Sequence, residues 1–253
     1  MIQSQIRKVL SSMQKCRVSA LLMGGQACVL YGGAEFSRDT DLAIVADAVN
    51  LVRLKKALLE LQAEPIATPP LELRYLRRGH AVHFRCHHPE ASRMRVDIMS
   101  RMRGVGGFAS LWRRRTSLEY PDGTIVNIMA LPDLVLAKKT QRDKDWPMIR
   151  RLVEAHHFEH SSKPSAAQIQ FWFLELRTPE LLINLARSHG VRARALAPRR
   201  SLLRHALRGD AELLRSSLRE EEDAERDLDR RYWDPLRREL EKLRHQRTVH
   251  PRN

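Results

Sequence analysis

Long apolar runs, aromatic side chains and metal-type cysteine spacings are scarce in this sequence. The longest stretch without a formal charge, residues 18–34, contains two glycine pairs and is slightly short for a membrane-spanning helix, which needs about 20 mainly apolar residues. The three cysteines, Cys16, Cys28 and Cys86, stand at no zinc-ligand spacing and cannot all pair with one another. These absences argue against a membrane span, a structural zinc site and a disulfide framework, and they favour buried thiols in a reducing compartment.

Acidic residues are the minority charge. The 253 residues include 45 Lys and Arg against 30 Asp and Glu, a formal net charge of +15, and 43% are hydrophobic. Such a chain has enough apolar residues to fold around a core, and its positive surface attracts polyanions. The N-terminal segment lacks the apolar core of a secretion signal. We therefore expect a folded cytoplasmic protein whose partners are nucleotides or nucleic acids and not membranes, although a generally arginine-rich proteome would give the same balance.

The character of the sequence changes at residues 161–165, a short polar stretch with a helix-breaking proline. Before it, β-rich runs alternate with helical spacing, which predicts strands over 18–23, 40–45, 81–86 and 94–99 and helices over 51–62 and 132–141. After it, apolar residues three and four positions apart predict only helices, over 166–176, 179–188, 200–207 and 211–242. We expect an α/β domain over residues 1–160 and an all-helical domain over 161–253. The charges of the last helix are typical of a solvated face with i,i+4 ion pairs.

The main functional pattern begins with Gly24 and Gly25, which follow the first predicted strand. Two glycines let the backbone turn sharply, so their N–H groups can hold a phosphate, although such a pair is more often a simple turn. Asp39 and Asp41 alternate along the next strand, which puts both carboxylates on one face. Neighbouring carboxylates repel each other unless a cation lies between them, and their hard oxygen atoms suit Mg²⁺. The pattern indicates a phosphate and magnesium site or, alternatively, a turn followed by two solvated acids.

A third carboxylate, Asp97, is the only one in the strand predicted over 94–99. A buried Asp without a partner is costly, so this residue needs one. Arg95 on the same face would give a structural ion pair, whereas metal ligation together with the first two acids would give Asp97 a chemical role. His83 and Arg85 alternate on a strand expected to adjoin that of Asp97, where they would reach a base or ribose.

At these residues the chain resembles the nucleotidyltransferase superfamily that shares the DNA polymerase β catalytic fold, in its minimal and abortive-infection toxin-type branches. The matching positions are Met23-Gly24-Gly25, Asp39-Thr40-Asp41, Asp97, and Asp133 with Lys138 five residues later. Residues 139–145 look like the basic helix that follows in such proteins. The resemblance covers about residues 18–155 and implies a mixed sheet with flanking helices.

The resemblance implies the transfer of a nucleoside monophosphate from a nucleoside triphosphate (NTP) to an acceptor hydroxyl, with two Mg²⁺ ions. Asp39 and Asp41 would bridge both ions, and Asp97 would hold the acceptor-side ion and take the hydroxyl proton. Lys138, together with Arg142, would neutralise charge on the phosphates. Asp133 lies near the predicted start of the same helix as Lys138, where its expected role is capping.

The net charge favours RNA as the acceptor, for example the 3′ end of tRNA, in a toxin-like or defence setting with a cognate antitoxin protein. A cationic aminoglycoside acceptor, which occurs in the same superfamily, is disfavoured by a basic surface unless the cleft itself is locally acidic. The arginine-rich residues 187–208 could track a polyanion backbone, with few aromatics for base stacking.

Many relatives carry Arg-x-Thr-x-Asp-x-Asp, and a second register would take Asp41 as the first acid and put Ala43 in the second ligand position. That register implies a degenerate site in a noncatalytic RNA- or protein-binding module. We prefer the Asp39/Asp41 register because it retains both acids on one strand face.

Overall fold

The computed structural model describes residues 4–34 and 36–249, and the chain divides into two compact units. The first, here called the sheet unit, comprises Met1–Leu30, Glu35–Ala137 and Arg231–Asn253. The second, here called the helical unit, comprises Tyr31–Ala34 and Lys138–Arg230. The expected boundary at residue 160 lies inside the helical unit, because the polar stretch after it only connects two helices that pack together.

The sheet unit contains a mixed sheet of seven strands in the order β3-β4-β5-β2-β1-β7-β6. The strands are β1 (Ala20–Met23), β2 (Asp39–Ile44), β3 (Ala63–Pro65), β4 (Val82–Cys86), β5 (Arg95–Met99), β6 (Thr116–Glu119) and β7 (Ile125–Ile128). The pairs β1–β7 and β2–β5 are parallel, and the other neighbours are antiparallel. This arrangement confirms the predicted α/β class with a mixed sheet.

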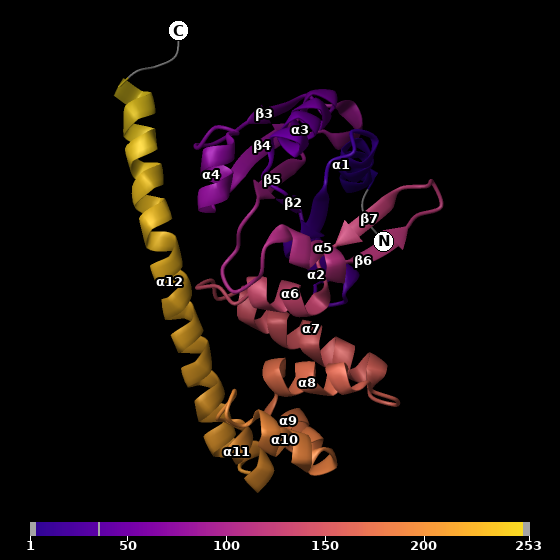
Figure 1. Cartoon of the computed structure of the whole chain (residues 1–253), viewed down its shortest axis with the longest axis vertical. Coiled ribbons are helices and arrows are strands. Elements are labelled where there is room, and N and C mark those ends of the chain that lie inside the picture. The colour runs from indigo at the N-terminus through magenta and orange to yellow at the C-terminus, as the bar shows by residue number, and fades with distance from the viewer. Residues whose placement is uncertain (1–3, 35, 250–253) are drawn as a thin grey trace. The chain divides into compact units, whose positions relative to one another are not determined.

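Helices from the N-terminal part of the chain flank these strands (Figure 1). They are α1 (Ser4–Lys15), α2 (Gly24–Leu30), α3 (Ala48–Glu60), α4 (Leu73–Arg78), α5 (Phe108–Arg114) and α6 (Leu131–Ala137), with a short 3₁₀ helix at Pro89–Ala91. Local chemistry sets their ends: the Asp47 side chain accepts a hydrogen bond from the Asn50 N–H at the start of α3, and α4 ends at Gly79 in the left-handed conformation. The cysteines are free and buried, as expected.

One predicted helix ends earlier than its apolar spacing suggests. The helix expected over 132–141 is α6, which stops at Ala137, and the next helix begins only at Asp145. Residues 139–145 are therefore a turn that leads into a helix and not the basic helix expected from the resemblance. The reason is local: the Asp145 carboxylate accepts hydrogen bonds from Lys138, Thr140 and Arg142, which folds the intervening chain into a turn.

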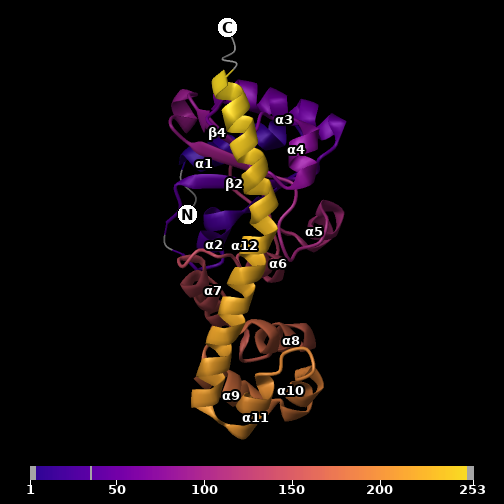
Figure 2. The same cartoon turned by 90° about the vertical axis from the view of Figure 1, so that its left-hand side faces the viewer.

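The helical unit contains short helices and the first part of one long helix (Figures 1 and 2). They are α7 (Asp145–His160), α8 (Ala166–Glu175), α9 (Pro179–Ser188), α10 (Gly190–Leu196), α11 (Leu203–Arg208) and α12 (Ala211–Val249), which from residue 231 belongs to the sheet unit. A capping box of Ser165 and Gln168 starts α8, and the Trp172 indole donates a hydrogen bond to His156 Nδ1 of α7. The predicted helical character of this part of the chain is confirmed.

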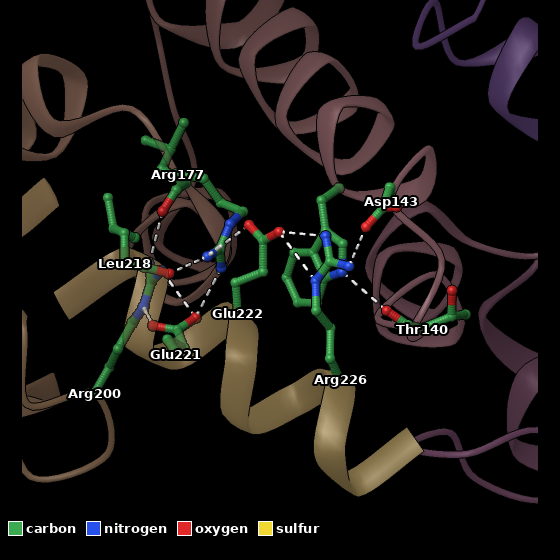
Figure 3. A network of polar contacts seen from close by, with 10 residues as sticks. Thr140, Asp143, Arg177, Arg200, Leu218, Glu221, Glu222 and Arg226 are labelled. Atoms are coloured by element: carbon green, nitrogen blue, oxygen red, sulfur yellow. Dashed lines mark hydrogen bonds and ion pairs between the residues drawn. The ribbon is translucent and has the colours of Figure 1, made fainter. Parts of the chain in front are cut away.

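The polar face of α12 is only partly the solvated surface that its sequence suggests (Figure 3). Glu221 accepts hydrogen bonds from Arg177 and Arg200, whose side chains are each 7% exposed. Arg226 pairs with Glu222 at the expected i,i+4 spacing and also with Asp143. Burial acts to raise the pKa of Glu221, but the two arginine charges lower it below its ordinary value. This network joins the start of α12 to the other helices of its unit.

Within the described residues, no helix combines the length and the apolar character that crossing a membrane requires.

Candidate functional site

The three predicted carboxylates meet on one face of the sheet. Asp39 and Asp41 alternate with the buried Thr40 along β2, and Asp97 alternates with buried residues along β5. Because β2 and β5 are parallel and Asp41 lies directly opposite Asp97, the side chains of these two residues point to the same side. The strand register therefore brings together residues that lie more than fifty positions apart in the sequence.

The two glycines belong to the first turn of α2, here called the glycine turn, which directly follows β1 and lies next to Asp41. Gly24 has a positive φ of 65°, and a Cβ atom built on it would lie 1.8 Å from Asp41 Oδ2. The Gly25 N–H donates a hydrogen bond to the same oxygen atom over 3.4 Å. A Cβ atom on Gly25 would lie 2.6 Å from Ser37 Oγ. Glycine is therefore required here by the close approach of the Asp41 carboxylate and not only by the turn.

Asp97 has two hydrogen-bond partners on the same face. Its Oδ1 atom accepts a hydrogen bond from Arg95 Nε over 2.8 Å and lies 2.9 Å from His83 Nδ1 on the adjoining strand β4. Burial acts to raise the pKa of the Asp97 carboxyl, but the hydrogen bonds from His83 and Arg95 lower it below its ordinary value. The ion pair with Arg95, which the sequence offered as the alternative to metal ligation, is present, and the strand of His83 adjoins that of Asp97 as expected.

Arg95 also interacts electrostatically with Asp39 and Asp41. Its hydrogen bond to Asp97 raises its pKa, burial opposes this rise, and the charges of Asp97, Asp39 and Asp41 add to it, so that the pKa lies above its ordinary value. The Arg95 side chain is 39% exposed, so solvent can replace part of this interaction. Arg95 thus partly neutralises a cluster of carboxylates that would otherwise repel one another.

The donor chemistry of this face fits Mg²⁺, which binds carboxylate oxygen atoms together with substrate phosphates. The geometry is less complete, since over residues 4–34 and 36–249 no three His, Cys, Asp or Glu side chains converge as ligands of one ion. One cause is visible at Asp97, whose Oδ1 atom is occupied by Arg95 and His83. Asp39 and Asp41 are the acids of this face that would first hold such an ion.

The alternative register, with Ala43 in the second ligand position, meets a structural obstacle. Ala43 is 1% exposed and lies in the interior of β2, between Leu21 on β1 and Met99 on β5. Asp39 and Asp41, in contrast, are both partly exposed. The Asp39/Asp41 register stays the prediction, and it places both carboxylates of the pair at partly exposed positions of β2.

The predicted phosphate-binding cations, Lys138 and Arg142, gather around one buried carboxylate of the helical unit. Lys138 Nζ lies 3.2 Å and an Arg142 amino group 2.8 Å from the carboxylate of Asp145, which is fully buried. Burial acts to raise the pKa of Asp145, but Lys138, Thr140 and Arg142 lower it. The Lys138 side chain is 9% exposed and that of Arg142 is 54% exposed, so Arg142 is the more accessible cation.

Asp133 lies in the first turn of α6, as expected, but its carboxylate forms a further interaction. Arg114, at the end of α5, donates two hydrogen bonds to it, over 2.9 Å and 2.8 Å. Neither this pair nor the role of Asp145 is evident from the sequence, because spacing in the chain does not reveal which acid a distant arginine contacts. Both residues of the predicted motif thus have a partner within the fold: Asp133 pairs with Arg114, and Lys138 pairs with Asp145.

No protein-family model matches the chain, and no curated protein matches it significantly. The functional argument accordingly depends on the arrangement of the two glycines and three acids of the sheet unit.

Proposed function

We propose that the sheet unit catalyses the transfer of a nucleoside monophosphate from an NTP to an acceptor hydroxyl. The observation that supports this most directly is the contact between the glycine turn and Asp41, with Asp39 and Asp97 on the same sheet face. A glycine turn whose backbone packs directly against a carboxylate cluster suits a substrate that carries both phosphates and bound Mg²⁺.

Each residue of this face has a proposed task. Bound Mg²⁺ would orient the triphosphate and stabilise the charge that develops on the leaving pyrophosphate. Asp39 and Asp41 would hold the ions, and Gly24 and Gly25 would let the phosphates approach the backbone. The lowered pKa of Asp97 keeps this carboxylate ionised at neutral pH, which suits cation binding more than the acceptance of a proton.

Lys138 and Arg142 are the proposed phosphate-neutralising cations. Arg142 is 54% exposed and therefore open to an anionic ligand, whereas the ammonium group of Lys138 is paired with the buried Asp145. Substitution of Lys138 would therefore affect both the phosphate interaction and the turn at residues 138–144.

The proposed acceptor is RNA, such as the 3′ end of tRNA, because the net charge of +15 favours a polyanion over a cationic small molecule. Modification of an RNA by a cytoplasmic enzyme of this type would suit a toxin-like or defence role, controlled by an antitoxin protein.

One observation supports a second candidate, a noncatalytic RNA- or protein-binding module with a degenerate site. Arg95 and His83 occupy the Asp97 carboxylate, and Arg95 supplies positive charge where a metal ion would otherwise be needed. A protein that has exchanged its metal for an arginine would keep the fold and lose the chemistry.

The test is to incubate the pure protein with each α-³²P-labelled NTP in turn, with Mg²⁺ and total RNA. We expect label on RNA with at least one nucleotide, and its loss in the Asp39→Asn and Asp41→Asn variants, because each variant removes ligand charge with little change in packing. Asp227→Asn on α12 is the matched control and should retain activity. Absence of label with all four nucleotides would favour the binding module, and full activity of Asp39→Asn would exclude the preferred register.

A further inference from the structure

The helical unit carries a group of arginines that form no ion pair with an acid in the part of the chain that the structure describes. Between Glu180 and Asp210 the chain contains seven arginines and no acidic residue. Arg200 points into the buried network, whereas six others are exposed or half-buried and form no ion pair with the described residues. These six, here called the arginine surface, are Arg187, Arg192, Arg194, Arg199, Arg204 and Arg208.

Packing of α9, α10 and α11 brings several of these arginines together. The helix α11 packs against both α9 and α10, and the three lie side by side in both views (Figures 1 and 2). Gly209 directly follows Arg208. A Cβ atom built on Gly209 would lie 4.0 Å from an amino group of Arg187, which is van der Waals contact. Arg204 and Arg208 are four residues apart on α11 and therefore share one face. Arg187, Arg204 and Arg208 thus come from two helices to one region.

The arginines of α12 behave differently. Arg230 and Arg237 are exposed and Arg215 is half-buried, but each pairs with a carboxylate three residues earlier on the same helix. The two sets therefore have the same residue type and similar exposure, and they differ in whether an acid is supplied by the protein. Like charges four residues apart destabilise a helix unless an opposite charge is near. Among the described residues no acid supplies that charge to the arginine surface, so an anionic partner would relieve the repulsion.

We propose that the arginine surface binds the phosphate backbone of folded RNA. Guanidinium groups form bidentate hydrogen bonds with phosphate, and several of them in one region suit a polyanion with regularly spaced charges. Residues 181–209 contain no Phe, Tyr or Trp to stack on unpaired bases. The surface therefore recognises the backbone of a duplex region and not a single-stranded sequence.

An anionic membrane is the other polyanionic partner, and the structure disfavours it. A helix that binds a bilayer surface inserts several large apolar side chains. In residues 181–209, the one large hydrophobic side chain recorded as exposed is Val191. The surface thus offers charge without the apolar face that would hold a membrane.

This inference builds on the proposed function, because the arginine surface would hold the RNA whose hydroxyl accepts the nucleotide. It is tested without NTP or Mg²⁺, so that binding is measured independently of catalysis. The probes are a fluorescent RNA duplex of about 20 base pairs, long enough for several phosphate contacts, and a single-stranded oligouridine of the same length.

The test variant is Arg187→Ala/Arg204→Ala/Arg208→Ala in the full chain, and the control is Arg215→Ala/Arg230→Ala/Arg237→Ala, which has the same net charge. We expect duplex binding to weaken about tenfold or more in the test variant at low salt, and the slope of log affinity against log salt to decrease by about two to three. The control should stay within about twofold of the wild type, because its arginines are already neutralised. Circular dichroism and thermal melting would show that both variants are folded.

Several results would overturn the inference. They are equal affinities of the two variants for the duplex, tighter binding of oligouridine than of the duplex, and binding to phosphatidylglycerol vesicles without binding to RNA. Weak duplex binding by the wild type itself would also overturn it. Nucleotide transfer that persists in the test variant with unchanged RNA affinity would leave the proposed function intact and exclude this surface. If the wild type bound the duplex as expected but labelled no RNA, the arginine surface would stand and the proposed nucleotide transfer would be excluded.

Discussion

The two units arrange their charged residues in opposite ways. In the sheet unit, three like charges meet on a partly exposed face of β2 and β5, and Arg95 opposes them only in part. In the helical unit, opposite charges are matched in a network around Glu221, and the surplus arginines lie outside it. The difference shows two uses of charge: matched pairs connect helices of one unit, whereas unmatched groups of one sign remain available to a ligand.

The largest expected change in stability follows from breaking the matched network around Glu221. It tests whether this network stabilises the helical unit. Arg200→Ala would remove the hydrogen bonds to Glu221 and to two main-chain carbonyl groups, and it would leave a carboxylate without its main partner. We expect the free energy of unfolding to fall by about 3 to 5 kcal/mol, as for other broken buried pairs. Thermal or urea unfolding followed by circular dichroism measures this loss.

The neighbouring Arg199 provides the matched control, because it is exposed and pairs with no acid among the described residues. Arg199→Ala should change the unfolding free energy by about 0.5 kcal/mol or less. Similar losses in both variants would mean that the network contributes no more than an ordinary surface charge.

A smaller effect on stability, but a large one on activity, is expected at the glycine turn of the sheet unit. Gly24→Ala would place a Cβ atom within 1.8 Å of Asp41 Oδ2, at a backbone position with positive φ. We expect a loss of about 1 to 3 kcal/mol from the backbone strain and the displaced carboxylate, together with loss of RNA labelling. Gly107→Ala is the control, because nothing lies within 4 Å of its Cβ position. If Gly24→Ala labelled RNA at the wild-type rate, the close approach would have no role in catalysis.

The smallest expected effect is a pH dependence of the unfolding free energy that arises from His156 in the helical unit. Burial, followed by the nearby charge of His160, lowers the pKa of His156 below its ordinary value of 6.5. The neutral ring accepts the hydrogen bond from Trp172, so protonation removes this interaction. The unfolded chain then binds the proton more tightly than the folded chain. The stabilisation is complete above about pH 6.5 and is lost as the pH falls through the lower folded-state pKa.

We therefore expect the unfolding free energy to be lower at pH 5.5 than at pH 7.5, by about 1 kcal/mol at most from this residue. His156→Gln keeps a hydrogen-bond acceptor that does not titrate, so its pH dependence over this interval should be weaker. The same pH dependence in both proteins would assign the effect to other groups.

The central elements of the fold were predictable because their apolar patterns are strong. The cores of β1, β2, β4 and β5 and the existence of α3 follow from residues that alternate or repeat every three to four positions. The edge strands β3 and β6 were not predicted, since most of their residues are exposed and show no alternation. The boundary at residue 160 was placed on a proline and polar residues, which also occur in a short turn between packed helices.

The candidate site was predictable to a similar extent. Alternation alone put Asp39 and Asp41 on one face, and Arg95 on the face of Asp97. The location of Lys138 was misjudged as part of a helix, because the buried Asp145 that ends the helical path lies seven residues further on. A buried acid in a turn has no periodicity by which the sequence could reveal it.

The sequence by itself determined the α/β and helical character of the two parts, the alternation of the acids and the absence of acids between residues 180 and 210. These properties depend on neighbours within a few positions of the chain. Only the tertiary structure decided that Asp41 lies opposite Asp97, that Gly24 leaves room for a carboxylate, and which arginines are neutralised. The physical reason is that a contact between distant residues depends on strand register and helix packing, which the whole fold sets through the burial of its core.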